Sequence, residues 1–251
     1  MTRELRRLLI GPERLVGQIV ALAPAEAHYL GRVLRLRPGD RFDLVDGAGR
    51  LWSARLIQAD RAELEQPLQA PLQQQAAPAP ALALAMALPR RDADVLLRMV
   101  VELGIDRIQP LLAERSIGPA VPRPERLAAL VREAVEQCER LHQPQLLAPL
   151  RASALLGSPP PDGPGRGLLA TSRLAGRPLL LEAVAPLAAT ARCSGLTLAV
   201  GPEGGWSPAE EKLALAQGWQ PVSLGPTILR CSTAGVAAAA LLSHWRQALE
   251  P

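Results

Sequence analysis

The chain has 251 residues, of which 48% are hydrophobic and 21% charged, and its formal net charge is +4. This composition argues against disorder and allows one large domain or two small ones. No apolar run approaches the ~18 residues that a membrane span needs, and the N-terminus lacks a cleavable signal pattern, so we expect a cytoplasmic protein without membrane contact.

The three cysteines, Cys138, Cys193 and Cys231, show no CxxC spacing, which argues against a disulfide framework or a metal site. The 28 basic residues are all arginine except Lys212. Guanidinium groups suit phosphate, so a polyanionic partner is compatible with this composition although the small net charge does not require one. Aromatic residues make up only 2% of the chain, too few for a sheet that stacks several bases.

The first part of the chain is predicted to be a small β-rich module. Apolar residues alternate through 41–66 on both sides of an Asp46-Gly47 turn. A short helix opened by Pro24 precedes them. Residues 66–80 are rich in Pro, Gln and Ala, a linker composition. We therefore expect one domain over 1–70, a linker over 71–80 and a second domain over 81–251.

From residue 81 onward, expected strands alternate with expected helices. The strands fall at 81–88, 107–112, 168–171 and 195–200, and the helices at 91–103, 124–140 and 179–187. This alternation predicts an α/β domain with a parallel sheet that is covered on both faces.

The stretch 200-VGPEGGWSPAEEK-212 ends the last of these strands. Ser207 and Glu210 form a capping-box pattern around Pro208, which predicts a helix that stops at Gly218. Residues 201–206 are then a loop between the carboxyl end of a strand and a helix, which is where open parallel sheets bind ligands.

A second glycine loop follows at 223-SLGPTILRCSTAG-235. The first loop has neither the lysine of a phosphate loop nor a GxGxxG pattern, and Glu203 favours a neutral or cationic ligand. The second loop sets Leu224, Ile228 and Leu229 beside backbone amides, an arrangement that suits adenine. The two loops could hold a positively charged nucleoside such as S-adenosylmethionine; the alternative is a pair of purely structural tight turns.

VGPEGGWS followed by SLGPTILR closely resembles the signature of the bacterial 16S ribosomal RNA (uracil-N3)-methyltransferases, which belong to the SPOUT class. The stretch 28-HYLGRVLRLRPGDRFDLVDGAG-49 resembles the PUA-like N-terminal domain of that family. Two further stretches, 101-VELGIDRIQPLLAERS-116 and 132-REAVEQCERLHQP-144, also match it in order and spacing. The resemblance covers nearly the whole chain.

This resemblance implies a small PUA-like β-barrel domain followed by a parallel-sheet domain with a deep trefoil knot. It implies a homodimer through the knotted domain, where the small residues of 233–245 would let two helices approach; an ordinary buried helix is the alternative. The implied reaction is methylation of N3 of a uridine in 16S ribosomal RNA, either naked or in the small subunit. The cofactor, S-adenosylmethionine, would be bound by the two glycine loops and the loop after 168–171, with these candidate residues: Thr171, Val200, Gly201, Pro202, Glu203, Gly204, Gly205, Leu224, Gly225, Ile228, Leu229, Ser232 and Thr233.

For catalysis we expect Arg230 to stabilise the uracil anion at a carbonyl oxygen. The candidate proton acceptors are Glu203, water and a group from the other subunit. Both named residues also have a plain alternative: an ion pair for Arg230, and acceptance of backbone amides of its own loop for Glu203. An N-terminal basic patch would bind RNA phosphates, or else form a solvated face. Its members are Arg3, Arg6, Arg7, Arg32, Arg35 and Arg37.

The chain departs from the family pattern at Thr227, where arginine is common, and at Cys231-Ser232, where a Thr-Glu pair is common. These changes leave open a different RNA target, either another base or a ribose 2′-hydroxyl. A non-catalytic RNA-binding ribosome-assembly factor is the third hypothesis.

Overall fold

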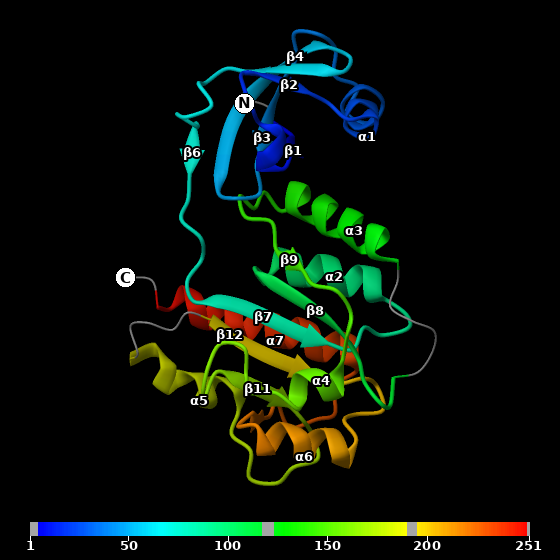
Figure 1. Cartoon of the computed structure of the whole chain (residues 1–251), viewed down its shortest axis with the longest axis vertical. Coiled ribbons are helices and arrows are strands. Elements are labelled where there is room, and N and C mark those ends of the chain that lie inside the picture. The colour runs from blue at the N-terminus through cyan, green and yellow to red at the C-terminus, as the bar shows by residue number, and fades with distance from the viewer. Residues whose placement is uncertain (1–4, 117–122, 190–194, 250–251) are drawn as a thin grey trace. The chain divides into compact units, whose positions relative to one another are not determined.

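The computed structural model describes residues 5–116, 123–189 and 195–249. The chain divides into two compact units (Figure 1). The first consists of Met1–Ala77 with Arg132–Gln143, and the second of Pro78–Val131 with Pro144–Pro251.

The first unit is built on a sheet with the strand order β1-β3-β4-β5-β2, and β6 pairs with β4. β1 and β3 are parallel and the other pairs antiparallel. Phe42, Leu44 and Trp52 are fully buried in its core, which confirms the predicted β-rich module. Its elements are β1 (Arg7–Leu9), a 3-10 helix (Pro12–Arg14), β2 (Ile19–Ala21), α1 (Pro24–His28), a short π-helix (Tyr29–Val33), β3 (Arg41–Val45), β4 (Arg50–Gln58), β5 (Arg61–Leu64) and β6 (Gln73–Gln74).

The first unit differs in two ways from the expected division at 70 and 80. β6 lies inside the expected linker, and residues 132–143 join the first unit although they come from the middle of the chain. The amide of Leu9 donates to Oε1 of Glu136 at 2.9 Å, and the amide of Gly49 donates to the carbonyl of Leu141 at 3.0 Å. Such bonds join residues that are about 90 to 130 positions apart, so local composition gives no sign of them.

The second unit contains a sheet in which every pair is parallel, in the order β10-β8-β7-β12-β11-β13, with β9 beside β8. All residues of β12 are buried, as expected for a central strand covered on both faces. The predicted parallel sheet is therefore confirmed. Its strands are β7 (Ala81–Met86), β8 (Arg107–Leu112), β9 (Gln145–Leu146), β10 (Leu150–Arg151), β11 (Gly167–Ala170), β12 (Gly195–Val200) and β13 (Gln220–Val222).

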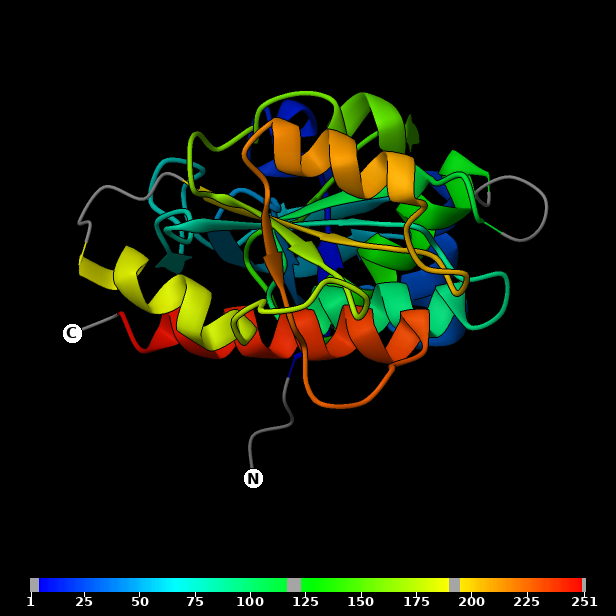
Figure 2. The same cartoon turned by 90° about the horizontal axis from the view of Figure 1, so that it is seen from below.

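Helices cover both faces of this sheet (Figure 2). α2, α5 and α7 lie on one face, and α4 and α6 on the other. None of the described helices is long and apolar enough to cross a lipid bilayer. The helices are α2 (Ala93–Glu102), α3 (Pro124–Gln137), α4 (Ala152–Leu156), α5 (Leu180–Val184) with a 3-10 turn (Ala185–Ala189), α6 (Pro208–Ala216) and α7 (Cys231–Gln247).

Candidate active site

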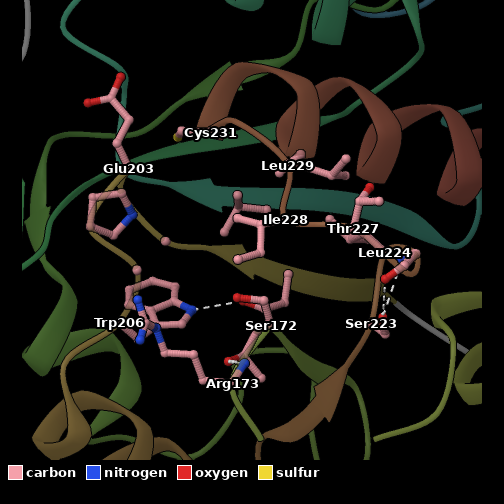
Figure 3. A pocket seen from close by; sticks show the side chains of 18 of the residues that line it. Ser172, Arg173, Glu203, Trp206, Ser223, Leu224, Thr227, Ile228, Leu229 and Cys231 are labelled. Carbon is pink, nitrogen blue, oxygen red and sulfur yellow. Dashed lines mark hydrogen bonds between the residues drawn. The ribbon is translucent and has the colours of Figure 1, made fainter.

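A pocket opens at the carboxyl ends of β11, β12 and β13, three strands that are neighbours in the sheet (Figure 3). Its empty volume, including the open mouth, is about 760 Å³. Three segments that are separated in sequence therefore meet here, as parallel sheets require of their strand ends. The lining residues are Ala170, Thr171, Ser172, Arg173, Arg177, Val200, Gly201, Pro202, Glu203, Gly205, Trp206, Ser223, Leu224, Gly225, Thr227, Ile228, Leu229, Cys231 and Ala234.

The first glycine loop turns sharply after β12. The amide of Gly205 donates to the carbonyl of Pro202 at 2.8 Å, and Gly205 has φ +69°, which favours glycine because other residues carry a Cβ that clashes there. The next residue, Trp206, is buried and donates from its indole nitrogen to the carbonyl of Ala170 at 2.9 Å. The loop after β12 is thus fastened to the end of β11.

The predicted capping box at the start of α6 is confirmed. Ser207 Oγ accepts from the amide of Glu210 at 3.2 Å, and Glu210 Oε2 accepts from the amide of Ser207 at 2.9 Å. The other oxygen of Glu210 accepts from the amide of Glu114 at 2.9 Å, and Arg115 donates to the carbonyl of Trp206 at 3.1 Å. The residues after β8 therefore also hold the glycine loop in place.

The second glycine loop presents apolar side chains. Ser223 Oγ donates to the carbonyl of Gly225 at 2.9 Å and closes a tight turn. Ile228 lines the pocket, and its side chain is 84% exposed. An uncovered apolar surface beside Leu224 and Leu229, with the exposed Glu203 among the other lining residues, fits a flat heteroaromatic ring joined to a cationic group.

Residues 76–243 match the model of the RNA methyltransferase domain, and residues 22–65 match the RNA methyltransferase PUA domain. The ribosomal RNA small subunit methyltransferase E of Synechocystis is 39% identical over 240 residues, which cover 94% of this chain and 77% of the relative. The protein of the same name from Mycobacterium tuberculosis is 30% identical over 242 residues, with 91% and 89% covered. This chain belongs to the ribosomal RNA small subunit methyltransferase E family.

Solved structures agree with the family assignment. The Neisseria gonorrhoeae ribosomal RNA small subunit methyltransferase E, crystallised with S-adenosyl methionine, superposes with a TM-score of 0.77 at 30% identity, covering 96% of this chain and 98% of that one. A probable rRNA-methyltransferase from Porphyromonas gingivalis gives 0.75 at 26%, covering 97% and 99%. The family, the parallel-sheet domain and the PUA-like domain expected from the sequence are therefore confirmed, and the trefoil knot stays a prediction.

Most of the predicted cofactor-binding residues line the pocket, whereas four predicted site residues do not. α7 begins at Cys231, and Cys231 and Ala234 lie on one helix face towards the pocket, so the two residues between them point elsewhere. Gly204 lies against Arg115 instead, where a Cβ would come within 3.0 Å of the Arg115 Cβ. The ten in the lining are Thr171, Val200, Gly201, Pro202, Glu203, Gly205, Leu224, Gly225, Ile228 and Leu229, and the four outside it are Gly204, Arg230, Ser232 and Thr233.

Several lining residues were not predicted, among them Ser172, Arg173, Arg177 and Trp206. The signal for the first three was their position just after the 168–171 strand. Trp206 directly follows the two glycines, but sequence alone does not show that its ring turns back towards β11.

Cys231, one of the departures from the family pattern, contributes a neutral group to the pocket. Its Sγ donates to the carbonyl of Ala87 at 3.0 Å. Burial, with a further contribution from Glu203, raises the pKa of this thiol to about 12. Cys231 is therefore protonated at neutral pH and does not act as a nucleophile or a general base.

The N-terminal arginines expected to bind RNA have mixed surroundings. Arg7 is half-buried and forms an ion pair with Glu139 at 3.1 Å, so a carboxylate already balances its charge. Arg3 lies outside the described residues. The members that are exposed on the first unit are Arg6, Arg32, Arg35 and Arg37.

Proposed function

We propose that the protein transfers the methyl group of S-adenosylmethionine to N3 of a uridine in 16S ribosomal RNA. The observation that carries this proposal is the single pocket in which both glycine loops and the segment after β11 meet. The printed names of the relatives support a small-subunit ribosomal RNA substrate, and the ligand of the Neisseria enzyme supports the cofactor.

The residues present fit this cofactor. Leu224, Ile228 and Leu229 would cover the adenine, and the glycine backbone at 201 and 205 lets the chain approach it closely. Glu203 supplies a negative charge that suits the sulfonium. When bound, the cofactor supplies a methyl group that is already activated by the positive sulfur, so the protein contributes mainly position and electrostatics.

The uracil N3 proton must leave before or while the N3–CH3 bond forms and the methyl–sulfur bond breaks. Arg230 precedes α7 as its N-cap residue and is exposed. There it can donate to O2 or O4 as negative charge develops, and the positive end of the α7 dipole adds to its effect. Glu203, itself exposed, takes the proton directly or through water.

Four further features complete the proposal. The exposed N-terminal arginines bind RNA phosphates, and the chain works as a homodimer in the cytoplasm with a trefoil knot in its second unit. Gly235, Ala238 and Ala239 are buried inside the chain itself, where Gly235 packs on Met86. The dimer contact would therefore use the half-buried face of α7 that carries Val236, Ala237 and Ala240.

The test is methyl incorporation from labelled cofactor into naked 16S ribosomal RNA and into isolated small subunits, followed by nucleoside analysis of the product. We expect N3-methyluridine at one position per RNA molecule. Methylation of another base or of a ribose would contradict the proposed target. RNA binding without any binding of S-adenosylmethionine in calorimetry would instead identify a non-catalytic assembly factor.

A further inference from the structure

Three charged side chains line the pocket, and two of them have evident roles. Glu203 offers the negative charge that a sulfonium requires. Arg177 donates from its guanidinium to the carbonyl of Leu174, so this group already has a partner within its own segment. Arg173 is exposed, and its side chain has no carboxylate partner among the residues that the structure describes.

The backbone at Arg173 is fixed, although its side chain is free to bind. The amide of Arg173 donates to Oγ1 of Thr171 at 3.3 Å, and this hydroxyl donates to Oε1 of Glu211 at 2.6 Å. Glu211 belongs to α6, the helix that follows the glycine loop. The base of the Arg173 side chain is therefore tied to the same element that positions the first glycine loop.

The Arg173 side chain runs towards the first glycine loop. Figure 3 shows it extending from the segment after β11 towards Trp206, on the opposite side of the view from Leu224 and Thr227. A Cβ built on Gly205 would lie 3.5 Å from Nε of Arg173. The guanidinium thus lies over the Gly205 turn and away from the apolar loop that suits adenine.

This guanidinium could bind either the cofactor or the RNA, and the charges of the two ligands favour the RNA. S-adenosylmethionine carries a sulfonium and an ammonium against one carboxylate, so its net charge is positive and disfavours a neighbouring guanidinium. A nucleotide that enters the mouth of the pocket brings its own phosphates. Guanidinium groups bind phosphate through two parallel N–H···O bonds.

We propose that Arg173 binds a backbone phosphate of the target nucleotide at the mouth of the pocket. This inference rests on the proposed function. Arg173 orients the nucleotide and does not take part in proton transfer. Because a target base must leave its stack to reach the cofactor, a phosphate contact next to the pocket would hold the displaced nucleotide in place.

The experiment compares Arg173→Met with Arg151→Met, which removes the same charge from an exposed residue of the second unit that does not line the pocket. We expect Arg173→Met to lower kcat/KM on the RNA substrate by roughly tenfold to a hundredfold, as for the loss of one charge-assisted hydrogen bond. The salt dependence of RNA binding should fall by about 0.7 in the log–log slope, the value for one single-strand phosphate contact. Arg173→Lys should recover part of the activity, and Arg151→Met should match the wild type.

Calorimetry with S-adenosylmethionine alone completes the test. Unchanged cofactor affinity in Arg173→Met supports a role with RNA, whereas a loss of affinity would place Arg173 at the cofactor and overturn the inference. Equal activity and salt slope in the two methionine variants would also overturn it. Failure of the proposed function is seen separately, because then the wild type itself does not methylate the RNA.

Discussion

The indole nitrogen of Trp206 donates a hydrogen bond of 2.9 Å to the carbonyl oxygen of Ala170, so the glycine loop after β12 is fastened to the end of β11. Both residues line the pocket. This bond therefore connects the stability of the strand ends to the shape of the candidate active site.

Trp206→Phe removes this bond and keeps an aromatic ring. We expect the free energy of unfolding to fall by about 1–3 kcal/mol and the affinity for S-adenosylmethionine to fall as well, because the loop loses its anchor. Trp219→Phe is the matched control: Trp219 donates in the same way to the carbonyl of Ser158 at 3.0 Å, in the same core but outside the pocket. Denaturant unfolding and calorimetry should show similar stability losses in both variants. Equal losses of cofactor affinity would contradict the anchoring role.

Gly205→Val places a branched side chain at φ +69° in the pocket lining. Gly218→Val does the same at φ +83° beyond the end of α6, where a Cβ would meet open space. Both should lose about 1–2 kcal/mol of stability through backbone strain. Only Gly205→Val should weaken cofactor binding, by tenfold or more, because its loop must move. Wild-type affinity in Gly205→Val would show that the first glycine loop does not contact the cofactor.

Arg246, near the end of α7, pairs with Asp106 and donates to the carbonyl of Gly104 at 2.8 Å. The side chains of Arg246 and Asp106 are 9% and 15% exposed, compared with 65% and 30% for the pair of Arg126 and Asp94. Arg246→Met should therefore lower the free energy of unfolding by about 3 kcal/mol, because a mostly covered carboxylate loses its cation.

Arg126→Met is the control for this effect, with an expected change below about 1 kcal/mol. Urea unfolding of both variants measures the difference. A loss in Arg246→Met no larger than that in Arg126→Met would show that α7 is not held by this ion pair.

Glu136 gives the first unit a pH-dependent stability. Burial raises its pKa from the ordinary 4.5 to about 7, although the amide of Leu9 and the charge of Arg132 act in the opposite direction. Below pH 4.5 the carboxyl is protonated in both the folded and the unfolded state. Between about pH 4.5 and 7 the carboxyl ionises mainly in the unfolded state, which stabilises that state. The free energy of unfolding therefore falls as the pH rises, by at most about 3 kcal/mol.

Glu136→Gln should remove this dependence and keep an oxygen that accepts from the Leu9 amide. The measurement is urea unfolding from pH 4.5 to 8, taken as the difference between the two proteins. We expect the variant to gain stability relative to the wild type as the pH rises through this window. Parallel profiles would mean that Glu136 has the same pKa in the folded and the unfolded state.

Features that depend on neighbouring residues were predictable from the sequence. The capping box of Ser207 and Glu210 needs only four consecutive residues, and the expected strands at 107–112 and 195–200 match β8 and β12. β9, β10 and β13 have only two or three residues, which is too short for a periodic pattern, so they were not predicted.

Local signals, namely strand–helix alternation, helix caps and glycine turns, predicted from the sequence alone a parallel α/β unit with glycine loops after its strands. Only the tertiary structure decided that β12, β11 and β13 are neighbours, so that Arg173, Trp206 and Ile228 line one pocket. It also assigned residues 132–143 to the first unit. The physical reason is range: caps and turns are set by bonds within a few residues, whereas strand order and domain membership depend on burial and hydrogen bonds between segments that lie far apart in the chain.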